Sequence, residues 1–296
     1  MVRQAQPVHG QVVLITGAAR GIGAESARRL AAKGARVALV GLEPEELERT
    51  AAACGPEAAW FEADVTDVEA LRGAVAGTVE RFGGIDHVVA NAGVAGAGPV
   101  RLIDPTSFER TVEVNLLGTW RTVRACLPHV IERRGYVLVV ASATAAVHPP
   151  GLAAYAASKA GAEAFANALR VEVDHLGVKV GVGYFSWIAT DMLAGGDAHP
   201  ALGFARANLP GPFGKTYPVS LVGDAVAEGI ERRRRWVTVP NWIRVLLALR
   251  GLLGPVFDAG GRRDAAEMDE RFARDVVERG AEASELAGAG GRAAGR

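Results

Sequence analysis

The sequence predicts an α/β protein built on a doubly wound parallel sheet of about seven strands, with helices on both faces. The first observation is an alternation: between Gln11 and Val239, short apolar runs alternate with longer segments of helical pattern. The second is that the short runs are rich in Val, Ile and Leu without polar alternation, which is typical of strands covered on both faces. Repeated strand–helix units are joined by right-handed crossovers, which make the strands parallel.

The individual elements follow from this alternation. The predicted strands are QVVLIT (11–16), RVALVG (36–41), AAWFEAD (58–64), DHVVAN (86–91), YVLVVAS (136–142), KVGVGYF (179–185) and WVTVP (236–240). The longer segments are predicted as helices, and they often stop at glycine, a common helix terminator. They span 24–34, 44–55, 67–83, 107–135 and 153–177.

Two regions depart from the alternation. Residues 191–220 contain four prolines and are predicted as a loop that lines the substrate pocket, because it is too long for a mere connection. Residues 241–296 start with the apolar stretch NWIRVLLALRGLLGPVF and end in a Gly/Ala/Arg/Glu tail, of which the last dozen residues are predicted to be disordered. The prediction is therefore one domain over 1–240 and a C-terminal apolar helix with its tail over 241–296.

The apolar stretch 242–257 has several candidate roles. It is too short to span a bilayer, and it carries Arg244 and Arg250. It could pack on the subunit, cover a lipophilic cleft, pair with another subunit or lie on a membrane surface. Packing or a lid is the preferred interpretation, and membrane contact ranks last.

Composition excludes several classes of function. The 296 residues carry 33 basic and 33 acidic side chains, so no net charge attracts nucleic acid or an acidic membrane. Cys54 and Cys126 are too few for a disulfide framework, and no Cys/His cluster has metal-ligand spacing. The lack of such a cluster predicts a protein without a metal. The N-terminal residues lack the apolar core of a signal peptide, which predicts a cytoplasmic protein.

A glycine-rich turn, TGAARGIG, lies between the first predicted strand and the first helix. Gly17 would allow the tight turn, Gly21 the close approach of a pyrophosphate, and Gly23 close packing of the helix on the strand. Backbone N–H groups at a helix N-terminus form an anion site. The turn therefore predicts a Rossmann-like dinucleotide site, although its G-x-x-x-G-x-G spacing differs from the commoner G-x-G-x-x-G.

Further motifs follow the glycine turn in a fixed order: DVTD with Asp64, NAG (Asn91, Ala92, Gly93), VNLLG with Asn115, VVASATA with Ser142, and YAASK with Tyr155 and Lys159. Together they resemble the single-domain short-chain dehydrogenases/reductases over roughly residues 11–240. The resemblance implies a catalytic set of Asn115, Ser142, Tyr155 and Lys159. It also implies cofactor contacts from Gly17, Gly21, Ile22, Gly23, Asp64, Val65, Asn91, Ala92, Gly93, Tyr155, Lys159, Ile188 and Thr190.

These residue types suit transfer of a hydride between a cofactor and a carbonyl. Tyr155 and Lys159 are one helical turn apart, so they point into the same cleft. A nearby ammonium, together with oxidised nicotinamide, is expected to lower the pKa of the tyrosine. Ser142, at a strand end, can donate a hydrogen bond to the substrate oxygen. In the family the lysine also holds the nicotinamide ribose, and the position of Asn115 within a long helix supports a water chain to the lysine.

One segment departs from the family pattern. The family usually has Pro-Gly after the sixth strand, where this chain has Phe185 and Ser186. Ile188 and Thr190 still match, so the contacts to the nicotinamide amide are expected to survive. Phe185 or Trp187 is expected to narrow the substrate pocket.

The cofactor preference depends on charges near the end of the second strand. The usual acid is replaced by Gly41, but Glu43, Glu45 and Glu46 follow it, and an acid there repels a 2′-phosphate. Arg20, inside the glycine turn, favours that phosphate. Three acids against one arginine favour NAD, with NADP as the alternative.

The sequence thus predicts an NAD(P)-dependent oxidoreductase that interconverts a secondary alcohol and a ketone on a small lipophilic substrate of steroid, acyl or aromatic type. Ser142, Tyr155, Phe185 and Trp187 are expected to contact that substrate. A catalytically idle dinucleotide-binding sensor or scaffold is the alternative, and a sugar-nucleotide epimerase or dehydratase fits poorly because the glycine spacing differs. A homodimer or homotetramer is expected, since small side chains in the helix of Tyr155 allow close packing.

Overall fold

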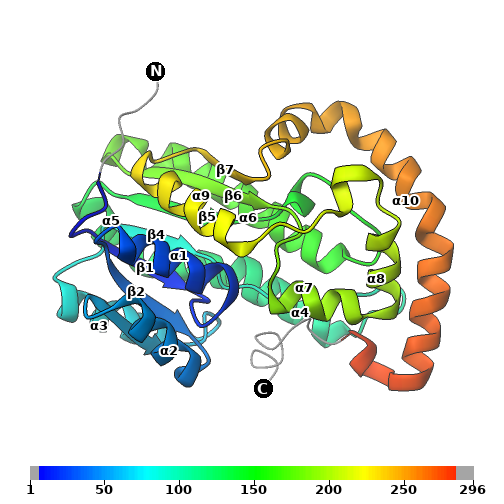
Figure 1. The fold of residues 1–296 in the computed structure, drawn as a ribbon, viewed down its shortest axis with the longest axis horizontal. Helices are drawn as coiled ribbons and strands as arrows, with labels where there is room; N and C mark the ends of the chain where they lie inside the picture. The colour runs from blue at the N-terminus through cyan, green and yellow to red at the C-terminus, as the bar shows by residue number, and fades with distance from the viewer. Residues whose placement is uncertain (1–6, 285–296) are drawn as a thin grey trace.

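The computed structural model describes residues 7–284. One seven-stranded sheet forms its centre, and Figure 1 shows helices packed around it. The strands are β1 (Val12–Thr16), β2 (Arg36–Gly41), β3 (Ala58–Glu62), β4 (His87–Ala90), β5 (Tyr136–Val140), β6 (Lys179–Phe185) and β7 (Trp236–Val239). Their order is β3-β2-β1-β4-β5-β6-β7, and every neighbouring pair is parallel. The predicted doubly wound sheet is confirmed. The order reverses between β1 and β4, where open α/β sheets bind their ligands.

Helices cover both faces of the sheet because apolar side chains point out of it on both sides. One face packs against α1 (Gly21–Ala32), α2 (Pro44–Cys54) and α9 (Val219–Glu231) through a cluster that includes Leu30, Leu47 and Val226. The other face packs against α3 (Val68–Phe82), α5 (Thr119–Glu132) and α6 (Ala153–Glu172) through Val75, Val123 and Ala162. The site residues therefore extend from a rigid, covered sheet.

The predicted helix over 107–135 is interrupted. Asp104 caps α4 (Pro105–Val112) by accepting a hydrogen bond from the backbone N–H of Ser107, and a π-helical turn, Glu113–Gly118, separates α4 from α5. The hydroxyls of Thr119 and Thr122 donate hydrogen bonds to carbonyl oxygens of this turn, at 2.7 and 2.8 Å. π-helical turns often occur at functional sites, and this one contains Asn115.

The prediction of a loop over 191–220 is wrong. The segment contains α7 (Asp191–Ala198), α8 (Pro200–Ala207) and a 3-10 turn (Gly211–Gly214). Its prolines start helices instead of breaking them: Pro200 occupies the first turn of α8, and Pro218 is the N-cap residue of α9. The Thr190 hydroxyl caps α7, and the His199 imidazole caps α8.

The C-terminal helix is longer than the apolar stretch that predicted it. α10 runs from Ile243 to Arg279 and arches along the edge of the molecule beside α8 (Figure 1). Its second half is held by Met268 and Phe272, which are buried. None of the helices within 7–284 is both long and apolar enough to cross a membrane. The predicted disordered dozen, 285–296, lies outside the described residues.

Candidate active site

The glycine turn joins β1 to α1 and has the conformation that the sequence predicts. Gly17 and Gly21 have φ values of +63° and +56°, in the left-handed region that favours glycine. A Cβ on Gly17 would come within 2.8 Å of the Ala92 Cα, and a Cβ on Gly23 would clash with the Gly17 carbonyl. The turn is therefore closed to side chains at Gly17 and Gly23, and it presents backbone N–H groups and the N-terminus of α1, as a pyrophosphate site requires.

Asn91, at the end of β4, holds this turn in place. Its side-chain amide donates hydrogen bonds to the carbonyls of Thr16 and Gly17, at 3.0 and 3.2 Å, and its backbone N–H donates to the Thr16 hydroxyl at 3.1 Å. Ala92 N–H donates to the same hydroxyl at 3.2 Å. The structure therefore gives the Asn91 side chain a supporting role: it fixes the turn that would contact the cofactor.

Arg20 forms ion pairs with acids from two distant segments. Its guanidinium binds both carboxylate oxygens of Glu43, one at 3.0 Å, and donates to Asp191 at 3.1 Å. These contacts raise the pKa of Arg20, with the hydrogen bond to Glu43 as the largest cause. Arg20 and Glu43, opposed in the sequence argument, are thus direct partners. The pair with Asp191 joins the glycine turn to the start of α7.

A second ion pair lies just after β3. Asp64, just after β3, accepts hydrogen bonds from Thr66 N–H and Arg110, both at 2.8 Å. Burial opposes its charged form, but these bonds lower the pKa of Asp64 overall. Val65 is buried, with its side chain against Gly118 of the π-helical turn, so only its backbone is available to a cofactor.

Lys159 and Tyr155 extend from α6 toward the end of β5. The Lys159 side chain is 3% exposed, and its ammonium donates to the Val140 carbonyl at 3.0 Å. This nitrogen lies 5.8 Å from the centroid of the Tyr155 ring. Burial lowers the pKa of Lys159 from 10.5 to about 8. The lysine can therefore exchange a proton near neutral pH.

Ser142 lies directly beside Tyr155. Burial raises the pKa of Tyr155, and a hydrogen bond with the Ser142 hydroxyl lowers it in part. The net direction is upward. The physical reason is desolvation, which disfavours the phenolate more than the neighbouring hydroxyl stabilises it. The lowering expected from Lys159 acting together with oxidised nicotinamide stays a prediction.

Asn115 is completely buried beneath these groups. Its side-chain oxygen accepts from Val94 N–H at 2.8 Å, and its amide donates to the Val94 carbonyl at 2.9 Å and to the Ser158 hydroxyl at 3.0 Å. A Cβ on Gly93 would lie 3.1 Å from the Asn115 side-chain oxygen and 3.2 Å from the Lys159 ammonium. Gly93, Asn115 and Lys159 therefore meet in one place, as the sequence predicts.

The segment after β6 places its predicted residues differently. Thr190 lies over the glycine turn, since its methyl group would be 3.4 Å from a Cβ on Gly21. Trp187 donates from its indole N–H to the Phe213 carbonyl at 2.7 Å. Phe185 does not wall the pocket: it is 4% exposed and packs in the α1/α9 core, which also contains Ile188. The side chain of Phe185 points to this face because strand residues alternate between the two faces.

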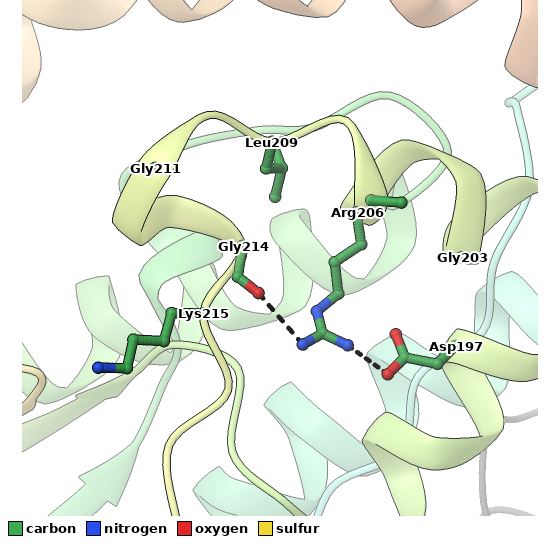
Figure 2. A pocket seen from close by; sticks show the side chains of 8 residues that line it. Asp197, Gly203, Arg206, Leu209, Gly211, Gly214 and Lys215 are labelled. Atoms are coloured by element: carbon green, nitrogen blue, oxygen red, sulfur yellow. Dashed lines mark hydrogen bonds and ion pairs between the residues drawn. The ribbon is translucent and has the colours of Figure 1, made fainter.

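A cavity of about 560 Å³ lies inside the segment 191–220 (Figure 2). Arg206 dominates it: the guanidinium binds Asp197 and donates to the Gly214 carbonyl at 3.2 Å. The same guanidinium stacks on Trp187, 5.3 Å from the ring centroid. None of Ser142, Tyr155 and Lys159 lines this cavity. The contacts of Arg206 instead hold α7, α8 and the following 3-10 turn together.

Sequence reasoning missed the residues that reach the site from a distance. Arg110 binds Asp64, and Asp191 binds Arg20. Met268 and Phe272 of α10 pack against the loops before Tyr155 and after Gly93, where a Cβ on Gly151 or Gly98 would meet them at 2.9 and 2.7 Å. The buried apolar pair, four residues apart on a helix, was the available signal for the last contact.

Known proteins resemble this chain in sequence and in fold. The family model for short chain dehydrogenases matches residues 11–200. An uncharacterised NAD-dependent oxidoreductase of Mycobacterium tuberculosis is 37% identical over 191 residues, which cover 58% of this chain and 70% of the relative. An 11-beta-hydroxysteroid dehydrogenase-like protein of Arabidopsis thaliana is 30% identical over 260 residues, 85% of this chain and 80% of the relative. The crystal structure of levodione reductase superimposes with a TM-score of 0.72 at 27% identity, covering 79% of this chain and 97% of the reductase.

These matches agree with the geometry. The glycine turn can accept a dinucleotide, and Ser142, Tyr155 and Lys159 come together at the carboxyl edge of the sheet. The chain therefore belongs to the short-chain dehydrogenase family and is an NAD(P)-dependent oxidoreductase.

Proposed function

We propose that the protein interconverts a lipophilic secondary alcohol and its ketone at Tyr155, with Ser142, Lys159 and Asn115 as the other members of the site. The observation that supports this most directly is the hydrogen bond between Ser142 and Tyr155 above the buried Lys159 ammonium. A nicotinamide cofactor, when bound, supplies or accepts the hydride. The Tyr155 hydroxyl gives a proton to the substrate oxygen or takes one from it.

The neighbouring groups prepare this proton transfer. The Ser142 hydroxyl donates a hydrogen bond to the substrate oxygen, which stabilises the developing alkoxide. Lys159, with a pKa of about 8, carries a positive charge for most of the time at neutral pH and favours loss of the Tyr155 proton. Asn115 fixes the loop that contains Val94 and so shapes the wall opposite these side chains.

The test is Tyr155→Phe, compared with Tyr136→Phe. Both changes remove one phenol hydroxyl; that of Tyr136 bonds to the Arg234 carbonyl at 2.7 Å, and Tyr136 begins the strand that ends near Ser142. We expect Tyr155→Phe to abolish turnover while cofactor affinity, measured by fluorescence titration, stays nearly unchanged. Tyr136→Phe should keep its turnover. If Tyr155→Phe kept most of its activity, the proposed mechanism would be wrong.

We favour NAD as the cofactor. Arg20, the residue that would bind a 2′-phosphate, is already paired with Glu43 and Asp191. Glu46 lies 3.9 Å from the same guanidinium, so acids surround it. The Mycobacterium tuberculosis relative is named as NAD-dependent. Measuring kcat/KM for both cofactors with one alcohol tests the preference, and a clear preference for NADP would contradict it.

The lipophilic substrate class is supported by the side chains around the segment 191–220. Phe213 is 36% exposed and lies edge-on to Trp242 and Phe257, with ring centroids 5.1 and 6.2 Å away. Apolar area of this kind contributes roughly 25 cal/mol per Å² when a ligand covers it. The Arabidopsis relative is named for a hydroxysteroid. A panel of steroid, acyl and aromatic alcohols against short polyols tests the class; faster turnover of a polyol would refute it.

We also expect the protein to be a homo-oligomer and to lie in the cytoplasm. Leu117 in the π-helical turn and Trp120 in α5 are 38% and 39% exposed. The small side chains of α6 serve two purposes: Ala156 and Ala162 pack inward, whereas Ala157 and Ala164 face solvent. Two such faces can approach closely, which supports pairing through α5 and α6.

A further inference from the structure

The first half of α10 is apolar on two opposite faces. Ile243, Leu246 and Leu247 are buried against the domain. On the other side Val245, Leu249, Leu252 and Val256 are 60%, 41%, 77% and 66% exposed; we call these four the α10 stripe. A surface helix normally has one apolar face toward the core and a polar face toward water. Packing against the domain therefore does not explain the apolar residues of the α10 stripe.

The spacing makes the α10 stripe a single continuous line. Its members follow one another at intervals of four, three and four residues. At 3.6 residues per turn, that spacing keeps all four side chains within roughly 60° of arc. The buried side chains lie on the opposite side of the helix, so the stripe points away from the core.

Positive charge gathers around the α10 stripe although the whole chain is neutral. Residues 241–263 contain four arginines and one acid, Asp258. Arg170, Arg235, Arg244 and Arg250 form a basic patch where α6, β7 and α10 meet: Arg235 and Arg250 both face Tyr184, and Arg235 also faces Arg170. Arg244 donates to the Trp236 carbonyl at 3.2 Å, which ties the start of α10 to this patch. The net charge of zero therefore conceals a local excess.

Two more cations follow the α10 stripe along the helix. Arg262 and Arg263 are exposed, and neither forms an ion pair with any residue in the described part of the chain. In the basic patch Glu163 neutralises only Arg250, through contacts of 2.8 and 3.0 Å. A line of aliphatic side chains with Arg244 before it and Arg262 and Arg263 after it matches a surface that is apolar inside and anionic outside.

A second copy of the chain fits this surface poorly. A two-fold interface places each patch against itself, so Arg244, Arg262 and Arg263 would face like charges. A stable interface also needs about 20–30 residues a side, with aromatic anchors near its centre. The α10 stripe offers four aliphatic side chains.

We propose that the α10 stripe and its arginines dock on an anionic lipid surface, with the first half of α10 lying in the plane of the interface. The four aliphatic side chains enter the boundary between headgroups and acyl chains, and the arginines contact lipid phosphates. From the sequence, membrane contact ranks last among the roles of 242–257; the exposure of the α10 stripe reverses that order. The proposal depends on neither the substrate nor the catalytic set.

The experiment measures binding of the full-length protein to vesicles by co-sedimentation. One vesicle preparation is phosphatidylcholine alone, and the other contains about one third phosphatidylglycerol. We expect binding to the anionic vesicles that weakens with salt, and at least about tenfold weaker binding to phosphatidylcholine alone. The double variant Leu249→Glu/Leu252→Glu should bind at least about tenfold more weakly than the wild type. Arg262→Gln/Arg263→Gln should lose about as much on the anionic vesicles only.

Val277→Glu is the matched control, since Val277 is 87% exposed on the same helix outside the α10 stripe. It should bind as the wild type does. Circular dichroism and turnover of a water-soluble alcohol show that each variant is folded, and Leu252→Glu alone replaces the double variant if that one unfolds. No binding to anionic vesicles, equal binding by the stripe variant, or equal loss in Val277→Glu overturns the proposal. A stripe variant with half the molecular mass of the wild type, together with no vesicle binding by the wild type, also overturns the proposal. That result would identify a second copy as the occupant.

Discussion

Replacing Lys159 by methionine should make the protein more stable while it removes activity. The side chain is 3% exposed, and burial lowers its pKa from 10.5 to about 8. A shift of this size corresponds to roughly 3 kcal/mol, at about 1.4 kcal/mol per pKa unit, by which the folded state disfavours the charged lysine. Methionine keeps an unbranched apolar side chain, one atom shorter than lysine, without the charge.

One contact is lost in this substitution. The ammonium donates to the Val140 carbonyl at 3.0 Å, and leaving this carbonyl without its donor costs about 1 kcal/mol. We therefore expect the free energy of unfolding of Lys159→Met to exceed that of the wild type by about 2 kcal/mol at pH 7. Turnover should fall to background, because the tyrosine loses its neighbouring positive charge.

The pH dependence gives the sharper test. Because the pKa of Lys159 is lower in the folded state, the unfolded state binds more protons between about pH 8 and 10.5. Wild-type stability therefore rises with pH across this window, and position 159 of the variant adds no such rise. The advantage of the variant should be complete below pH 8 and should vanish near about pH 9.5. By pH 10.5 the variant should be less stable by about 1 kcal/mol, because the neutral lysine keeps its hydrogen bond to the Val140 carbonyl.

Urea unfolding of both proteins at pH 7 and pH 10, followed by circular dichroism, measures the difference. Lys33→Met is the control: Lys33 is an exposed lysine paired with Glu231, and an exposed pair contributes little. A Lys159→Met protein that is no more stable than the wild type at pH 7 would refute the reasoning. So would an advantage that stays constant between the two pH values.

Two further predictions concern the cofactor and the oligomer. Glu43→Gln should release Arg20 from its carboxylate partner and raise kcat/KM for NADP relative to NAD by roughly tenfold. Glu45 is exposed and paired with Arg49, so the control Glu45→Gln should leave this ratio unchanged. An unchanged ratio in Glu43→Gln would show that Arg20 lies away from the 2′-phosphate. Trp120→Glu should halve the molecular mass measured by light scattering. The control is Trp60→Glu, since Trp60 is 38% exposed on β3, and it should leave the mass unchanged. A monomeric wild type would contradict pairing through α5 and α6.

The sheet could be predicted because strands covered on both faces are continuous apolar runs. The proposed catalytic set was expected from ordered motifs that resemble the family, with Tyr155 and Lys159 one helical turn apart. The ion pairs Arg20–Asp191 and Arg110–Asp64 could not be predicted, since they join residues 171 and 46 positions apart without any periodicity. The prolines of 191–220 misled the prediction because proline begins helices as readily as it interrupts them.

The packing of Met268 and Phe272 against the loops near Gly151 and Gly98 has a consequence for biosynthesis. A ribosome completes the glycine turn, Ser142, Tyr155 and Lys159 long before it reaches α10. The nascent chain can therefore assemble its catalytic groups while the two loops beside them still lack their covering side chains. Because α10 follows every strand of the sheet along the chain, these loops gain their covering side chains only after the last strand has been made.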